Sequence, residues 1–401
     1  MSTGPPRALG RNNRVVAVAI LLISLGASAR GSQNPGCVFL MIWPSARSTS
    51  MGGVMTAIAD ESDAAYWNPG GLGFQRSLGG TLTLANWLPG LYKGMYYAYL
   101  STGFTPSWTP WQGASVNGGI NITYLSTGEM DVVNERGDFL GRYTAWDGAF
   151  GVHGGVKLSD QWGVGINLKL VHSFLVPEWV WKVMPELGIE SGGTGTTAAS
   201  DIGILYRPIE PVSLGLCFGN IGPGISYTSS GESDPLPAML RLGASYTLFD
   251  SKNSKVRLAL ELDKILVGMF YDTTGTKSSG RMLQEEMRDA WKGIAVEGTY
   301  LKFVSLRFGY FEDLTGQRGG VVIEKEGQTY HYGLGDILAR RNLGRVKSVG
   351  YCEGLGIGYK DYIRLEFSDD HLIYDFPTTN FKIALTVNNL QGFLHEISSP
   401  Q

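Results

Sequence analysis

The sequence predicts an all-β protein, an antiparallel up-and-down β-barrel of about 14 strands that crosses a membrane. Between Trp162 and Leu170 every second residue is large and apolar, and the residues between them are small, polar or charged. Successive side chains of a strand point to opposite faces, so this segment has one apolar and one polar face. Such alternation is typical of strands whose apolar face contacts lipid. It recurs in 212–218, 240–248, 306–310 and 381–387.

The composition agrees with a membrane barrel. Only 17% of the 401 residues are charged, whereas soluble proteins average about 25%, and the chain contains 56 Gly, 19 Tyr and 10 Trp. Gly permits close strand packing and curvature, and Trp and Tyr concentrate at the headgroup level. The net charge of -3, with no block of Lys and Arg, argues against nucleic acid as a partner.

The amino terminus has the features of a secretory signal peptide over 1–29. Three arginines precede an apolar core at 15–25, and Ala27-Ser28-Ala29 follows as a small-residue cleavage site. The core is too short to span a bilayer as a helix. The sequence therefore predicts four regions: a signal peptide over 1–29, an amino-terminal hatch over 30–77, a barrel over 78–390 and a tail over 391–401.

The hatch differs from everything after it, because it lacks alternation and is rich in Ala and Met. One or two short helices are expected there, broken at Asn68-Pro69-Gly70-Gly71. The strands of the barrel are expected at 78–87, 91–102, 113–125, 146–157, 161–173, 195–206, 212–220, 239–248, 256–264, 290–301, 303–311, 351–359, 360–368 and 379–389.

The predicted connections alternate in length, as an up-and-down meander requires. Long ones are expected at 126–145, 174–194, 221–238, 265–289 and 312–350, with short turns between them. Short turns of outer-membrane barrels face the periplasm. The parity therefore places the amino terminus and the hatch on the periplasmic side.

Two of the connections permit more than one interpretation. Segment 102–113 is either a short turn, with Trp108 and Trp111 at the inner headgroup belt, or a disordered loop. Segment 277–292 is either a small amphipathic helix outside the barrel or a solvated loop.

Charged residues of both signs fall on the inward register. A charge facing lipid would cost about 2–4 kcal/mol at the midplane, so we assign these side chains to the lumen. They either select a solute or, as we prefer, form ion pairs that join the strands and the hatch. Asp60, Glu61 and Asp63 of the hatch could meet Arg241, Arg307 or Arg364. The inward set is Lys169, Arg241, Arg257, Glu261, Asp263, Arg307, Arg364, Glu366 and Lys382.

No catalytic or cofactor-binding pattern is present in the sequence. None of the histidines has metal-ligand spacing to another His or to a Cys. The Gly-rich stretch 192–195 precedes a strand, not a helix, so it does not predict a phosphate loop. Cys37 follows Asn34-Pro35-Gly36, which lacks the apolar and small residues that precede lipid-modified cysteines. We predict a protein that is not an enzyme and uses no metal or cofactor.

The hatch region carries a family resemblance. Residues 51–54 read Met-Gly-Gly-Val, and residues 59–72 read Ala-Asp-Glu-Ser-Asp-Ala-Ala-Tyr-Trp-Asn-Pro-Gly-Gly-Leu. This stretch resembles the hatch motif of the PorV/PorQ family, whose barrels are related to the FadL fatty-acid transporters. Gly70 stands where the family usually has Ala, which we expect to be a mild change. The matching residues are Gly52, Gly53, Asp60, Asp63, Tyr66, Trp67, Asn68, Pro69, Gly70 and Leu72.

Three further stretches agree with this family in the same order: 124–129, 218–227 and 234–237. Two features depart from the family: the chain continues past Asn389 without a terminal aromatic residue, and the connection 312–350 is long. The matching loop residues are Gly128, Glu129, Asn220, Gly222, Pro223, Pro235 and Pro237.

The resemblance implies a fourteen-stranded barrel filled by its hatch and located in the outer membrane. PorV-type members work in type IX secretion, where they cap the translocon's lateral opening and carry secreted cargo to the surface attachment machinery. PorQ-type members hold a surface partner. The implied partners are the translocon, the carboxy-terminal domains of cargo, the attachment complex, and outer-membrane lipid including lipopolysaccharide.

Two other functions stay open at this stage. The first is a FadL-like channel for hydrophobic small molecules, which would need an apolar pocket in the lumen and a lateral gap in the wall. The second is a structural outer-membrane protein without an exchange partner.

Overall fold

A computed structural model describes most of the chain after residue 33. The predicted signal peptide over 1–29 lies outside the described residues. The described ranges are 34–75, 78–90, 94–109, 111, 114–185, 188, 191–228, 232–271, 276–339, 343–372 and 380–398.

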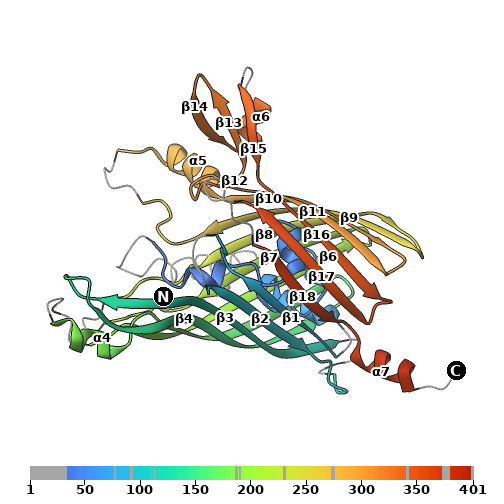
Figure 1. Ribbon diagram of the computed structural model, residues 1–401. Coiled ribbons are helices and arrows are strands. Elements are labelled where there is room, and N and C mark those ends of the chain that lie inside the picture. Colours follow the sequence, from blue (N-terminus) through green and yellow to red (C-terminus); the bar gives the residue numbers. More distant parts are fainter. Residues whose placement is uncertain are drawn as a thin grey trace, which may run out of the picture.

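Fourteen strands of the described chain form one closed antiparallel barrel, which confirms the predicted fold class (Figure 1). Each strand pairs with the next, and β18 pairs with β1 to close the ring. The barrel strands are β1 (Gly79–Asn86), β2 (Tyr96–Gly103), β3 (Ser115–Val133), β4 (Phe139–Lys157), β5 (Trp162–Phe174), β6 (Thr194–Ile209), β7 (Val212–Ile221), β8 (Met239–Asp250), β9 (Ser254–Ile265), β10 (Trp291–Tyr300), β11 (Val304–Asp313), β16 (Tyr351–Tyr359), β17 (Ile363–His371) and β18 (Lys382–Val387).

The side chains of these strands alternate as the sequence predicts. On β5, Leu168 and Leu170 are 55% and 56% exposed, whereas Asn167 and Lys169 are 1% and 8% exposed. A closed barrel has a lipid-facing outside and an enclosed inside, so exposure marks the membrane face.

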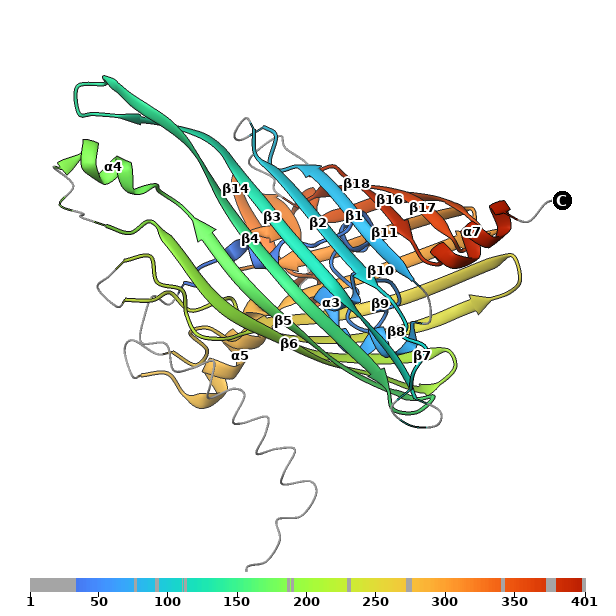
Figure 2. The same cartoon turned by 90° about the horizontal axis from the view of Figure 1, so that it is seen from below.

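Strands β3 and β4 are longer than predicted, and the expected long loop at 126–145 is wrong. Both strands continue past the irregularity between Ser126 and Glu129 to a short turn at 134–138. Arg142 pairs with Glu129 and Asp131 across this extension. Charged residues take several of its exposed positions, so the regular apolar alternation that reveals a membrane strand is missing there. Figure 2 shows the hairpin projecting beyond its neighbours.

The other long connections carry small elements. Helix α5 (Ser279–Asp289) confirms the helical interpretation of 277–292. Between β11 and β16 lie β12 (Arg318–Gly319), which pairs with β11, and an outer lobe formed by β13, β14, β15 and helix α6. The remaining bounds are α4 (Glu178–Val183), β13 (Val321–Lys325), β14 (Gln328–Tyr332), α6 (Leu334–Ala339), β15 (Arg345–Val349) and, after β18, α7 (Leu390–Ser398).

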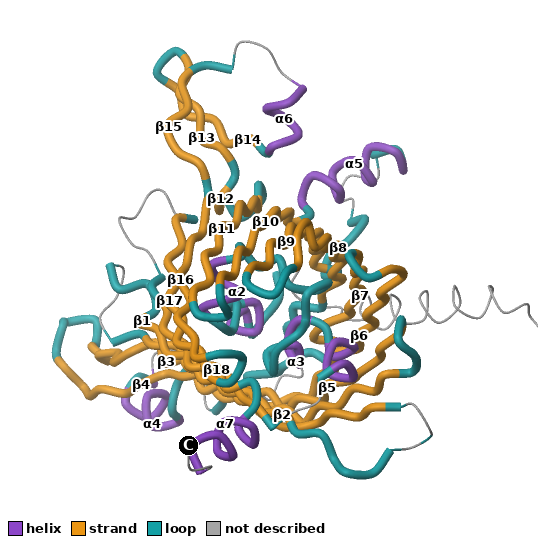
Figure 3. The backbone as a smooth tube through the Cα atoms, turned by 90° about the vertical axis from the view of Figure 1, so that its right-hand side faces the viewer, coloured by secondary structure: helices purple, strands orange, loops and turns teal. Residues whose placement is uncertain are grey.

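The hatch lies inside the ring of strands, where Figure 3 shows helices α2 and α3. Its elements are η1 (Val38–Met41), α2 (Ala46–Ser50), α3 (Ala64–Trp67) and η2 (Pro69–Phe74). The predicted break at Asn68 is the junction of α3 and η2, because the Asn68 side chain accepts from Gly70 N and caps η2. No helix in the described residues is long and apolar enough to cross a membrane.

The strand parity led us to expect the whole hatch at the short-turn end of the barrel. The structure places only part of it there. Gly36 N donates to Pro235 O at 2.9 Å, and Cys37 Sγ lies 3.7 Å from Tyr227 Oη. Both partners belong to the long connection between β7 and β8. Asp60, in contrast, lines a cavity together with Asn253 and Lys302 of two short turns. The hatch therefore runs through the lumen from the long-loop end to the short-turn end.

Candidate functional site in the barrel lumen

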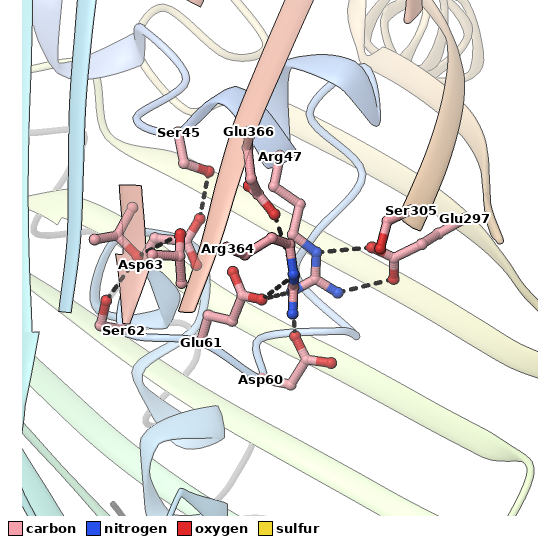
Figure 4. A network of polar contacts seen from close by, with 12 residues as sticks. Ser45, Arg47, Asp60, Glu61, Ser62, Asp63, Glu297, Ser305, Arg364 and Glu366 are labelled. Atoms are coloured by element: carbon pink, nitrogen blue, oxygen red, sulfur yellow. Dashed lines mark hydrogen bonds and ion pairs between the residues drawn. The ribbon is translucent and has the colours of Figure 1, made fainter. Parts of the chain in front are cut away.

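Arg47 of α2 is the centre of the contacts between hatch and wall (Figure 4). Its Nε lies 2.9 Å from Glu297 Oε1, and its Nη2 lies 2.8 Å from Glu297 Oε2. Its Nη1 lies 2.6 Å from Asp60 Oδ1 and 3.0 Å from Glu61 Oε1. The Arg47 side chain is only 4% exposed, so these carboxylates replace the water that it has lost.

The network continues into the barrel wall. Arg307 lies 2.7 Å from Glu297 and 3.0 Å from Glu366. Arg364 lies 2.7 Å from Glu61, and Arg257 lies 2.9 Å from Asp60. The network therefore joins β9, β10, β11 and β17 to the hatch, with charges in balance. Its four cations are Arg47, Arg257, Arg307 and Arg364, and its four carboxylates are Asp60, Glu61, Glu297 and Glu366.

Asp63 lies beside this network but meets none of the arginines that we expected for it. Its Oδ2 accepts from Ser45 Oγ at 2.6 Å. Burial and the nearby Glu61 carboxylate raise the pKa of Asp63 to about 7. The raised pKa fits this position, since Arg47, Arg307 and Arg364 already pair with other carboxylates.

Three other inward cations contact polar groups away from this network, and one of them, Lys382, donates to Trp43 O. Lys169 Nζ lies 2.6 Å from Asp201 Oδ1. Arg241 donates to Tyr66 O at 2.8 Å, and its guanidinium lies 4.6 Å from the centre of the Tyr66 ring. Glu261 Oε2 accepts from Thr56 N at 3.1 Å. Lys169 thus links β5 to β6, whereas Arg241 and Glu261 link β8 and β9 to the hatch.

The backbone of the hatch motif packs directly on the wall. Asn68 Nδ2 donates to Ile204 O of β6 and to Thr56 O of the hatch, each at 2.9 Å. A Cβ on Gly70 would lie 2.8 Å from Leu205 N and 2.9 Å from Gly163 O. The difference between Gly70 and the family's usual Ala is therefore not mild, because an Ala side chain at this position would push the hatch away from the wall.

The other hatch residues fill the interior. Gly53 has a φ of 76°, and a Cβ there would lie 2.6 Å from the Trp43 ring. Tyr66 Oη donates to Leu40 O at 3.1 Å. The remaining members of the motif are buried: Gly52, Trp67, Pro69 and Leu72.

Most of the loop residues singled out in the sequence meet at the long-loop end. Asn220 has a φ of 58°, its backbone N–H donates to Asp201 Oδ1 at 2.7 Å, and its Nδ2 donates to Pro237 O at 3.1 Å. Pro223 O accepts from Thr197 Oγ1 at 3.1 Å. Gly222 lies close to the Ala198 backbone, and Pro235 O accepts from Gly36 N. Gly128 and Glu129 lie elsewhere, at the irregularity of β3.

Water-accessible space occurs at the short-turn mouth of the barrel. Three cavities of about 470, 350 and 220 Å³ each include Asp60 in their lining. The first is bordered by Arg47, Arg257 and Arg364, so the hatch presents its charged network to this mouth. Within the described residues no group of His, Cys, Asp and Glu could hold a metal ion.

Sequence reasoning missed several residues that carry these contacts. Glu297 follows Gly293 and Ala295 on the inward register of β10, so the parity of the strand could have identified it. Arg47 and Ser45 lie in the non-periodic hatch, where no sequence pattern predicts which way a side chain points. Cys37 is 7% exposed, and burial raises the pKa of its thiol to about 11.

The fold and the filled lumen define a class, a transmembrane β-barrel whose interior is occupied by its own amino-terminal segment. The family model described as "Type IX secretion system protein PorV" matches residues 26–272. This match covers more than half of the chain, and the chain belongs to the PorV family. The family is one of type IX secretion, and the closed barrel fits an outer-membrane location.

Solved barrels with low sequence identity resemble the chain. The toluene transporter TodX of Pseudomonas putida is 10% identical, with 86% of this chain and 97% of that chain covered and a TM-score of 0.48. The toluene transporter TbuX of Ralstonia pickettii is 11% identical, with 86% and 96% covered and a TM-score of 0.45. A Pseudomonas aeruginosa FadL homologue is 11% identical, with 86% and 98% covered and a TM-score of 0.43. No curated protein sequence matches the chain.

Proposed function

We propose that this barrel is a non-enzymatic binding and shuttle protein of type IX secretion. It holds the translocon or secreted cargo and passes that cargo to the surface attachment machinery. The observation that carries this proposal is the balanced network between Arg47 and the wall, which holds the hatch in the lumen. A lumen filled in this way leaves the long connections and the outer wall as the surfaces for partners.

In this proposal the short turns face the periplasm and the long connections face outward. The outward surfaces are the β3–β4 extension, α4, α5 and the outer lobe. Carboxy-terminal domains of cargo bind these surfaces, and the translocon contacts the barrel wall. Outer-membrane lipid and lipopolysaccharide surround the remaining wall.

The outer lobe is well placed to hold a partner because its base and the adjoining β12 contact the barrel rim. Leu334 N donates to Glu312 Oε2 at 2.6 Å, and Gly350 N donates to Gly320 O at 2.7 Å. The Arg318 guanidinium lies 4.7 Å from the centre of the Trp291 ring. A partner on the lobe would thus be held at a defined position relative to the barrel.

Affinity purification of the tagged barrel from membranes, with mass spectrometry of the co-purified proteins, tests the proposal. The native barrel should recover translocon and cargo. A variant with 321–349 replaced by a short Gly-Ser linker should keep the translocon and lose cargo. A matched variant with 179–182 of α4 changed to Ser distinguishes cargo binding at the lobe from cargo binding at another outward surface. Recovery of the barrel alone would contradict the proposal.

Transport of hydrophobic small molecules is the rival function. It requires an apolar pocket, whereas the cavities around Asp60 are bordered by charged side chains. Fatty acid or detergent that co-purifies with the native barrel and is lost in Asn68→Ala would favour transport.

A further inference from the structure

Helix α7 (Leu390–Ser398) has an apolar face that the barrel covers only in part. Leu390, Phe393, Leu394 and Ile397 follow the i, i+3, i+4, i+7 spacing of one helix face. Leu394 is 55% exposed and Ile397 is 66% exposed, and no residue of α7 is buried. His395 and Gln391 lie on the other side of the helix. An amphipathic helix with this exposure needs a second apolar surface.

The first turns of α7 are fixed against the short-turn end of the barrel. Leu390 N donates to Leu78 O at 2.9 Å. The Phe393 ring centre lies 6.5 Å from that of Tyr359 and 6.3 Å from that of Tyr362. Tyr359 Oη donates to Glu396 Oε1 at 2.8 Å, and Lys360 pairs with the same carboxylate. Figure 3 shows α7 outside the ring of strands.

The exposed face of α7 continues the outer apolar surface of the barrel. Tyr300, Leu301, Phe303 and Tyr359 are 58%, 52%, 56% and 51% exposed at the same short-turn end. Aromatic residues at strand ends mark the level of the lipid headgroups in barrels of this type. The exposed face of α7 therefore adjoins side chains of the kind found at that level.

We propose that α7 lies flat in the headgroup region of the leaflet at the short-turn end. Leu394 and Ile397 contact phospholipid acyl chains there, and His395 faces water. This inference rests on the membrane location in the proposed function. Lipid is the partner of the apolar face because that face adjoins the lipid-facing wall. Since Lys360 neutralises Glu396, the contact is apolar and does not require anionic lipid.

Site-directed spin labelling in reconstituted phosphatidylethanolamine–phosphatidylglycerol bilayers tests this placement. Cysteines at Leu394, Ile397, His395 and, on the wall, Leu168 each receive a nitroxide. The native Cys37, Cys217 and Cys352 are buried, and labelled native protein gives the background. Accessibility to oxygen reports lipid, and accessibility to a water-soluble nickel chelate reports water.

The proposal predicts that labels at 394 and 397 favour oxygen, like the label at 168, whereas the label at 395 favours nickel. The pattern should not change when the phosphatidylglycerol fraction is raised. Nickel-accessible labels at 394 and 397, with 168 still in lipid, would overturn the placement of α7 and leave the membrane location intact. A water-exposed label at 168 would overturn both.

Discussion

Arg47 of the hatch holds Glu297 of β10 in a two-point ion pair, with N–O distances of 2.9 and 2.8 Å. The same carboxylate also accepts from Arg307 at 2.7 Å. Glu297 thus links the non-periodic hatch to two neighbouring strands of the wall. The filled lumen depends on contacts of this kind, so the stability of the hatch should respond to their removal.

Removal of the Glu297 charge should destabilise the barrel strongly. Glu297→Gln leaves Arg47 and Arg307 buried with one negative charge fewer beside them. Breaking a buried ion pair lowers the free energy of unfolding by about 3–5 kcal/mol. Denaturant unfolding in micelles, with proteolysis of the hatch as a second readout, measures this loss. Arg142→Met is the control, because its pairs on the exposed hairpin should contribute nothing measurable. Equal effects of the two changes would contradict a hatch fixed by Glu297.

Addition of one methyl group at Gly70 should loosen the hatch. Gly70→Ala places a Cβ 2.8–2.9 Å from backbone atoms of β5 and β6, and such overpacking costs about 1–3 kcal/mol. Gly280→Ala in α5 is the control, since a Cβ there meets nothing within 4 Å. The unfolding midpoint should fall for the first variant and not for the second. An unchanged midpoint for Gly70→Ala would show that the hatch backbone is not in close contact with the wall.

Asp63 should make the stability fall as pH rises. Its pKa is about 7 in the folded protein, against 3.8 as the ordinary value, so between these values the folded state binds more protons than the unfolded state. The free energy of unfolding therefore decreases through this window, by at most about 1.4 kcal/mol per pH unit, and levels off above pH 7. The difference between native protein and Asp63→Asn, measured from pH 4.5 to 8.5, isolates this contribution. A difference that is constant with pH would refute the raised pKa of Asp63.

Asn220 should tolerate Gly better than Ala. Both changes remove the bond to Pro237 O, but only Ala meets the left-handed backbone at φ 58° with a penalty of about 1–2 kcal/mol. Asn220→Gly should therefore unfold at a higher denaturant concentration than Asn220→Ala. The reverse order would contradict a left-handed backbone conformation at this position.

The periodic parts of the molecule could be predicted from sequence because lipid and lumen impose opposite demands on neighbouring residues. Lys169 between Leu168 and Leu170 can only point inward, and it does. The same logic failed beyond Ser126, where the register shifts and charged residues such as Glu129 and Asp131 take exposed positions.

The candidate site was less predictable because the hatch has no period. Nothing in the sequence around Arg47 indicates that it reaches Glu297, 250 residues away. Asp63 was expected to meet an arginine, but its neighbours Asp60 and Glu61 already occupy Arg47, Arg257 and Arg364. Competition among several carboxylates for few cations depends on three-dimensional positions, which local spacing does not encode.

A disulfide that locks the hatch to the wall tests the central claim most directly. A Cβ on Gly293 would lie 2.5 Å from Val54 Cγ2. Because Cγ2 is one bond from Val54 Cβ, the two Cβ atoms are at most about 4 Å apart, within the reach of a disulfide. Val54→Cys with Gly293→Cys, in a Cys352→Ala background, can be compared oxidised and reduced in cells. If partners bind outside a permanently filled lumen, cells that contain the oxidised barrel should secrete cargo at the native rate. A block on oxidation that reduction relieves would show that the hatch must move, and would contradict the account.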